Sequence, residues 1–131
     1  MTIITEDGEY IIGVGGSVVL YSLFSTVKIR LNCEVDYALD FIKTGECKVS
    51  NIKKALEQMK IIQMELREIT PREAVYNYEN IEEEAPWNNN ICEKISSCEE
   101  LFTTDNGKVL IDELINILEY ANKKNVSIIL P

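Results

Sequence analysis

Apolar residues recur at helical spacing in two long segments, which give the clearest secondary-structure predictions. In the first, the apolar stripe consists of Ile52, Ala55, Leu56, Met59, Ile62, Leu66 and Ile69. Charged residues occupy the opposite face, so the pattern predicts an amphipathic helix over 50–69. Ser50 is the predicted N-cap, and Thr70-Pro71 ends the helix because the residue before a proline avoids the helical region.

The second stripe predicts a helix over 108–122. Its apolar positions are Leu110, Ile111, Leu114, Leu118 and Ala121. The helix is predicted to begin at Thr104 or Asp105, through a turn that contains Asn106-Gly107. Lys123 and Lys124 near its end complement the helix dipole.

Short runs rich in β-branched residues lie at both ends of the chain. Residues 2–5 and 9–12 flank Asp7-Gly8, a pair typical of a β-hairpin turn. Residues 126–130 predict a buried final strand. Strands at both termini with helices between them predict an α+β fold, in which the last strand joins the hairpin in one sheet packed against several amphipathic helices.

Three segments between these elements are less clear. In 17–32 the apolar residues have helical spacing, but the β-branched content also allows a strand, and both alternatives stay open. Residues 34–43 predict a helix that stops at Gly45. Residues 74–78 predict a short strand or an extended segment, and residues 80–90 have the composition of a loop.

Length and composition predict one domain spanning 1–131. An apolar content of 46% and a charged content of 27% are ordinary for a globular protein of 131 residues. The N-terminus lacks the basic and long apolar regions of a signal peptide, and the apolar run over 11–24 is too short and too interrupted to span a bilayer. A cytoplasmic location is therefore expected.

The cysteines do not predict a metal site. Cys33, Cys47, Cys92 and Cys98 contain no C-x-x-C pair, and the chain has no histidine to complete a mixed site. In the cytosol these thiols would stay reduced and act as small apolar groups. The spacing alone leaves a disulfide open.

The residues also give little indication of a catalytic site. Without histidine there is no usual serine or cysteine triad. Glu82 and Glu83 are neighbours in a polar run, whereas a catalytic carboxylate pair needs an apolar pocket around one member. The glycines of 13–16 lack the phosphate-loop pattern, and Asp105-Asn106-Gly107 lacks the alternating ligands of a calcium loop. We therefore expect a protein that is not an enzyme and that has no cofactor or metal.

The chain concentrates its negative charge in residues 77–100. This window holds seven carboxylates and one lysine, Lys94, which gives −6 of the total net charge of −9. Such charge disfavours nucleic acid or an anionic membrane as partner, because both would repel it. An acidic segment around the single tryptophan, Trp87, suits docking to a basic protein.

The candidate partner-binding residues follow from this window. They are Glu79, Glu82, Glu83, Glu84, Trp87 and Asn88. The carboxylates would steer the encounter, and the indole ring would supply contact area. Trp87 has an alternative role at the edge of the core, because tryptophan is usually largely buried.

Several motifs in the second half of the chain resemble a known family. They are Pro86-Trp87, Ile95-Ser96 and the run Leu-Phe-Thr-Thr-Asp-Asn-Gly-Lys-Val-Leu over 101–110. In this order they resemble the bacterial immunity protein 70 family. The resemblance implies the antitoxin half of a polymorphic toxin or contact-dependent inhibition system, with a cognate toxin C-terminal domain as partner. The motif over 102–110 is expected to be structural, forming the turn into the last helix.

Charge and resemblance together lead to a functional hypothesis. The protein would neutralise a basic toxin domain, an RNase or DNase, by stoichiometric occlusion through its acidic surface. The alternative is a cytosolic adaptor or a subunit of a protein assembly unrelated to toxins. A small enzyme or ligand-binding domain would instead need a deep polar pocket. The sequence does not indicate an oligomeric state.

Overall fold

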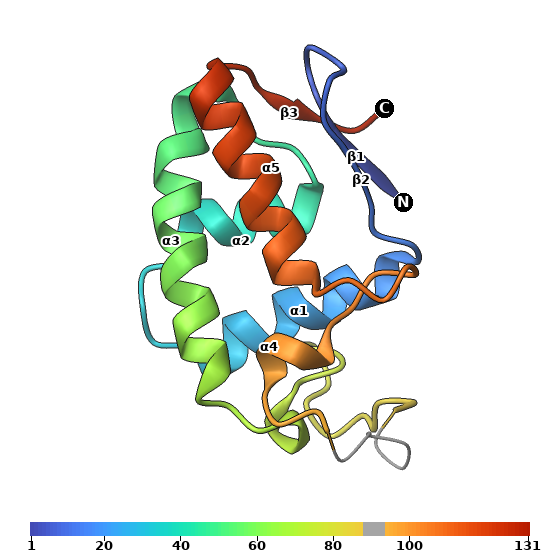
Figure 1. The fold of residues 1–131 in the computed structure, drawn as a ribbon. Helices are drawn as coiled ribbons and strands as arrows, with labels where there is room; N and C mark the ends of the chain where they lie inside the picture. The colour runs from blue at the N-terminus through green and yellow to red at the C-terminus, as the bar shows by residue number, and fades with distance from the viewer. Residues whose placement is uncertain (88–93) are drawn as a thin grey trace.

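The computed structural model describes residues 1–87 and 94–131, and in them a three-stranded antiparallel sheet lies beside a group of helices (Figure 1). The strands are β1 (Thr2–Thr5), β2 (Ile11–Gly13) and β3 (Ile128–Ile129), in the order β2-β1-β3. Ile4 pairs with Ile11 on one side and with Ile129 on the other. The predicted hairpin and its pairing with the C-terminal strand are confirmed.

The three predicted helices and the ambiguous segment 17–32 form the four longer helices of the described part of the chain, and two short helices over 71–73 and 98–101 were not predicted. In chain order the helices are α1 (Ser17–Arg30), α2 (Asp36–Thr44), α3 (Val49–Arg67), the short 3-10 helix η1 (Pro71–Glu73), α4 (Cys98–Leu101) and α5 (Leu110–Lys124). The α+β fold class is therefore confirmed. None of the helices in residues 1–87 and 94–131 is both long and apolar enough to cross a membrane.

The two amphipathic helices predicted most clearly, α3 and α5, pack against each other and form the centre of the hydrophobic core (Figure 1). Met59 and Ile62 of α3 and Leu114 and Leu118 of α5 are fully buried. Burial of each such side chain contributes about 1.5–3 kcal/mol relative to its exposure. Helix-period apolar stripes are thus the main determinant of this half of the fold.

The predicted starts of these two helices are wrong. Ser50 lies inside α3, whose N-cap is Lys48, and no side chain of the helix itself forms the cap. The N–H of Val49 donates instead to Oγ of Ser127, beside β3, at 2.8 Å. A residue distant in the chain satisfies the helix end, which a local capping pattern does not reveal.

The predicted start of the last helix is several residues early. Thr104 and Asp105 belong to a closed turn, and α5 begins only at Leu110. In this turn the N–H of Thr104 donates to the carbonyl of Lys108 at 2.8 Å, and that of Leu110 donates to the carbonyl of Phe102 at 2.9 Å. The turn over 102–110 thus has the structural role that the resemblance implies.

This turn also packs against the glycine loop that precedes α1. The Asp105 carboxylate lies directly against Gly15, in the space that a Cβ there would occupy. Gly15 has a φ of +91°, a region that favours glycine because it lacks a Cβ. Gly15 therefore serves the packing of the turn.

Segment 17–32 forms a helix over 17–30, but its polarity is unusual. Ser22, Ser25 and Thr26 are fully buried, whereas Val18 and Tyr21 are exposed. A hydroxyl group that is buried without a hydrogen bond costs free energy, so each needs a partner. The partners lie in residues 75–78, about fifty positions further along the chain.

Residues 75–78 run along α1 outside the sheet. Of the two alternatives predicted for residues 74–78, the extended segment is therefore correct and the short strand is not. Oγ1 of Thr26 accepts from the N–H of Val75 at 2.9 Å and donates to its carbonyl at 3.3 Å. Oγ of Ser25 accepts from the N–H of Tyr78 at 3.1 Å, and Oγ of Ser22 donates to the carbonyl of Tyr76 at 3.3 Å. Side chains of one helix thus replace a strand partner for this backbone.

Replacing Thr26 with valine should destabilise the protein. The shape is conserved, but both backbone groups of buried Val75 lose their partner. Unsatisfied buried groups cost about 1–3 kcal/mol, so the free energy of unfolding should fall by about that amount in urea denaturation. Thr2→Val, at an exposed strand position, is the matched control and should change stability by less than about 0.5 kcal/mol. Equal effects of the two substitutions would contradict this role of Thr26.

Candidate functional site

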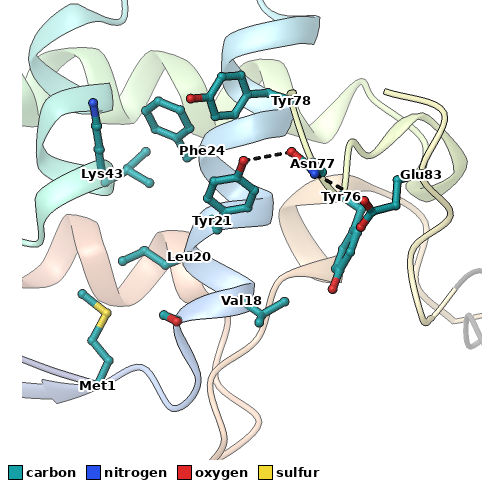
Figure 2. A pocket seen from close by; sticks show the side chains of 12 residues that line it. Met1, Val18, Leu20, Tyr21, Phe24, Lys43, Tyr76, Asn77, Tyr78 and Glu83 are labelled. Carbon is teal, nitrogen blue, oxygen red and sulfur yellow. Dashed lines mark hydrogen bonds between the residues drawn. The ribbon is translucent and has the colours of Figure 1, made fainter. Parts of the chain in front are cut away.

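A groove of about 440 Å³ lies between α1 and the segment that α1 holds (Figure 2). Its apolar floor includes Leu20 and Ile42, and Met1 and Val18 lie at its margin. Tyr21, Phe24, Tyr76 and Tyr78 supply the aromatic lining, and we call this hollow the aromatic groove. It exists because the hydroxyl groups of α1 fix the backbone of 75–78 beside the helix.

The rings of the groove pack against one another. The ring centroids of Tyr21 and Tyr78 are 5.7 Å apart, and those of Phe24 and Tyr78 are 5.5 Å apart with an edge-to-face arrangement. Nζ of Lys28 lies 5.5 Å from the centroid of Tyr78. Aromatic pairs and cations over rings each stabilise such a cluster, so these side chains form a defined wall.

Asn77 connects the aromatic groove to the acidic segment. Its Oδ1 accepts from the hydroxyl of Tyr21 and from the N–H of Glu79, both at 2.9 Å. Its Nδ2 donates to Oε1 of Glu83 at 3.3 Å (Figure 2). One amide side chain therefore fixes the start of the acidic segment against α1.

The four predicted carboxylates before Trp87 are exposed, and we call Glu79, Glu82, Glu83 and Glu84 the acidic rim. Glu83 also lines the aromatic groove. Partial desolvation and then the nearby charge of Glu79 raise the pKa of the Tyr21 hydroxyl, so it remains a donor toward Asn77. The structure thus places the rim at one side of the groove.

Glu99 and Glu100, at the other end of residues 77–100, make contacts within the fold. Glu99 forms an ion pair with Arg67 of α3 at 2.8 Å, and Glu100 accepts a hydrogen bond from Ser96. The candidate Asn88 lies outside the described residues, as does Glu93. The negative window of the sequence is therefore divided between a solvent-facing rim and a carboxylate paired within the fold.

Trp87 lies at the edge of the core. Its ring packs edge-to-face against Tyr76 at 5.6 Å and against Phe102 at 6.2 Å between centroids. Its Nε1 is buried and has no hydrogen-bond partner in the described part of the chain. Trp87 therefore has the position at the edge of the core that was predicted as its alternative role. Its contact with a partner stays a prediction.

A second hollow, of about 530 Å³, lies between α2 and β3 and contains more polar groups. Asp40, Glu46 and Cys47 line it. Burial and then the charge of Asp40 raise the pKa of the Cys47 thiol to about 11, the opposite of what a nucleophilic thiolate requires. Across residues 1–87 and 94–131, no group of three or more acidic or cysteine side chains could hold a metal ion.

Sequence reasoning predicted the acidic rim but missed the aromatic groove. Tyr21 and Asn77 are 56 residues apart, and no local pattern joins them. The signal that could have located the groove is the mixed polarity of the buried face of α1, in which hydroxyl residues stand among the apolar ones. Buried serine and threonine need hydrogen-bond partners, and in α1 another part of the chain supplies them.

Comparison with known proteins gives the family. The sequence matches the family described as immunity protein 70 over residues 5–130 of the 131, so the chain belongs to the immunity protein 70 family. Searches of curated proteins and of solved structures found no match. Membership gives the protein a general role as an immunity protein and implies a cognate toxin as its binding partner.

The cysteines give a prediction for the folded protein. Cys33, Cys47 and Cys98 are free thiols, while Cys92 lies outside the described residues. Burial raises the pKa of Cys98 to about 12, and Cys98 is fully buried, whereas Cys33 is partly exposed. In a Cys92→Ser background, iodoacetamide at about pH 8 should alkylate Cys33 at least about tenfold faster than Cys47 or Cys98.

Mass spectrometry of the alkylated peptides measures these rates. Unfolding in urea should remove the difference, because all three thiols then return to ordinary pKa values. Equal rates in the folded protein, or a disulfide that includes Cys47 or Cys98, would contradict the burial of these two thiols.

Proposed function

We propose that this protein binds the toxic domain of a cognate bacterial toxin and neutralises it by stoichiometric occlusion. The acidic rim is the first contact with a basic surface of the toxin. The observation that carries this proposal is the position of the rim, exposed in solvent and tied through Asn77 to the aromatic groove. Membership in the immunity protein 70 family supports the class of partner.

Charge supports a nuclease as the target. Residues 77–100 carry seven carboxylates and one lysine, which is −6 of the total −9. A nuclease must bind the phosphate backbone, so its active-site cleft is basic. Carboxylates of the rim occupy the same positive field and thereby compete with the nucleic acid for it.

In this mechanism the protein acts as a cover. Glu79, Glu82, Glu83 and Glu84 provide steering, and Trp87 and Asn88 extend the contact along the same segment. We place the action in the cytoplasm of the producing cell, where the thiols of Cys33, Cys47 and Cys98 would stay reduced. Each protein molecule inactivates one toxin domain.

Co-expression tests the proposal directly. The full chain is expressed with the C-terminal domain of the protein encoded immediately upstream, and growth and co-purification are both measured. We expect restored growth and a one-to-one complex. Toxicity without rescue, or an upstream gene that encodes no toxin, would overturn the proposal and favour an adaptor role.

Reversal of three rim charges should slow association. The variant Glu82→Lys, Glu83→Lys, Glu84→Lys replaces attraction with repulsion at the first contact. We expect the association rate constant at low ionic strength to fall by at least about tenfold, and its dependence on salt to weaken. Surface plasmon resonance over a salt series measures both quantities.

The matched control moves the same charge change to α3 and its C-cap residue, Glu68. Glu57→Lys, Glu65→Lys, Glu68→Lys alters three exposed carboxylates, so both triple variants change the net charge from −9 by +6 to −3. If only total charge matters, the two variants will slow association equally. Steering through the rim requires a clearly larger effect from the rim variant.

A further inference from the structure

The two ends of the aromatic groove carry opposite charges. Glu83 lines it at the end of the acidic rim, and Lys43 of α2 lines it on the other side (Figure 2). Nζ of Lys28, a residue of α1, already lies over the rings of Phe24 and Tyr78. A positively charged group entering the groove is therefore repelled from the side of Lys43 and attracted to the side of Glu83.

The groove lining suits a long side chain with an apolar stem and a cationic end. Leu20 and Ile42 at the floor are buried, and the rings of Tyr21 and Tyr78 stand beside them. Apolar and aromatic walls accommodate methylene groups and exclude water, and a pair formed at such a wall is stronger than one in open solvent.

The end of the groove is organised before any partner binds. Oε1 of Glu83 accepts from Nδ2 of Asn77, and both acceptor positions of Asn77 Oδ1 are already used by Tyr21 and Glu79. Asn77 is thus a positioning residue, and the carboxylate of Glu83 is the group presented to an incoming cation. A prearranged acceptor loses less conformational entropy on binding.

We propose that the aromatic groove receives one arginine side chain from a loop of the toxin, with its stem against the tyrosine rings and its guanidinium on Glu83. This proposal rests on the proposed function and identifies its central contact. Arginine fits better than lysine because its planar group stacks on aromatic rings and pairs with a carboxylate through two parallel hydrogen bonds. A volume of about 440 Å³ has room for the whole side chain.

The groove and the rim then have separate tasks. Exposed carboxylates of the rim act mainly on the rate of encounter, whereas a buried arginine acts mainly on the rate of dissociation. Arginine and the aromatic residues are the types most often found where a few residues dominate a protein interface. The groove would be such a centre, and the rim its surroundings.

Filling the groove tests the proposal without altering a charge. Val18 is 51% exposed at the margin of the groove, so Val18→Trp places a large ring over the entrance. We expect Kd for the toxin domain to rise by at least about tenfold in calorimetric titration, chiefly through faster dissociation. Ile61→Trp is the control, because Ile61 is 46% exposed on α3 outside the groove, and it should change Kd by less than about twofold.

Double-mutant cycles test the arginine itself with a variant that leaves the fold intact. Glu83→Gln is combined with alanine at each arginine of the toxin domain in turn. We expect one arginine to show a coupling to Glu83 of at least about fivefold in Kd, and its coupling to Glu57→Gln to stay below about twofold. No coupled arginine, or Val18→Trp binding like wild type, would refute the groove proposal.

These outcomes separate the two proposals. If the unaltered chain rescues growth and forms a one-to-one complex while the groove variants bind normally, the immunity function stands and the groove proposal fails. If the unaltered chain neither rescues nor binds, both fail together.

Discussion

The hydrogen bonds from the buried hydroxyl groups of α1 to the backbone of residues 75–78 are the constraint on which the candidate site depends. Ser22, Ser25 and Thr26 are buried and find hydrogen-bond partners in this segment, and the backbone of the segment lies outside the sheet. The hydroxyl groups of α1 and the backbone groups of residues 75–78 therefore serve as hydrogen-bond partners for one another. The arrangement holds Asn77 beside Tyr21, and through Asn77 it fixes the start of the acidic rim.

The parts of the fold that sequence predicted are those in which local pattern and burial agree. The stripes of α3 and α5 face each other in the core, and Asp7-Gly8 turns the hairpin as expected. Predictions failed where a distant residue supplied the partner. Ser127 caps α3 in place of Ser50. The segment of α1 left both a helix and a strand open, because its β-branched residues are compatible with either.

The candidate site divides in the same way. The acidic rim is a run of neighbouring residues, so composition alone located it, whereas the aromatic groove is assembled from α1, α2 and residues 76–83. The negative charge counted over residues 77–100 also included Glu99, although Arg67 of α3 pairs with it. Charge counted along a chain gives the sign of a surface, but which carboxylates reach that surface is decided by tertiary pairing.

The hydrogen bonds that the hydroxyl groups of α1 form with this segment involve the backbone of residues 75, 76 and 78, not their side chains. A change of a partly exposed side chain in this segment therefore leaves these backbone hydrogen bonds in place. An inhibitor that must match one particular toxin needs a surface whose chemistry can change while its scaffold does not. Buried hydroxyl groups on a helix, bonded to the main chain of a loop, provide that separation, and the price is a helix whose sequence looks less helical than it is.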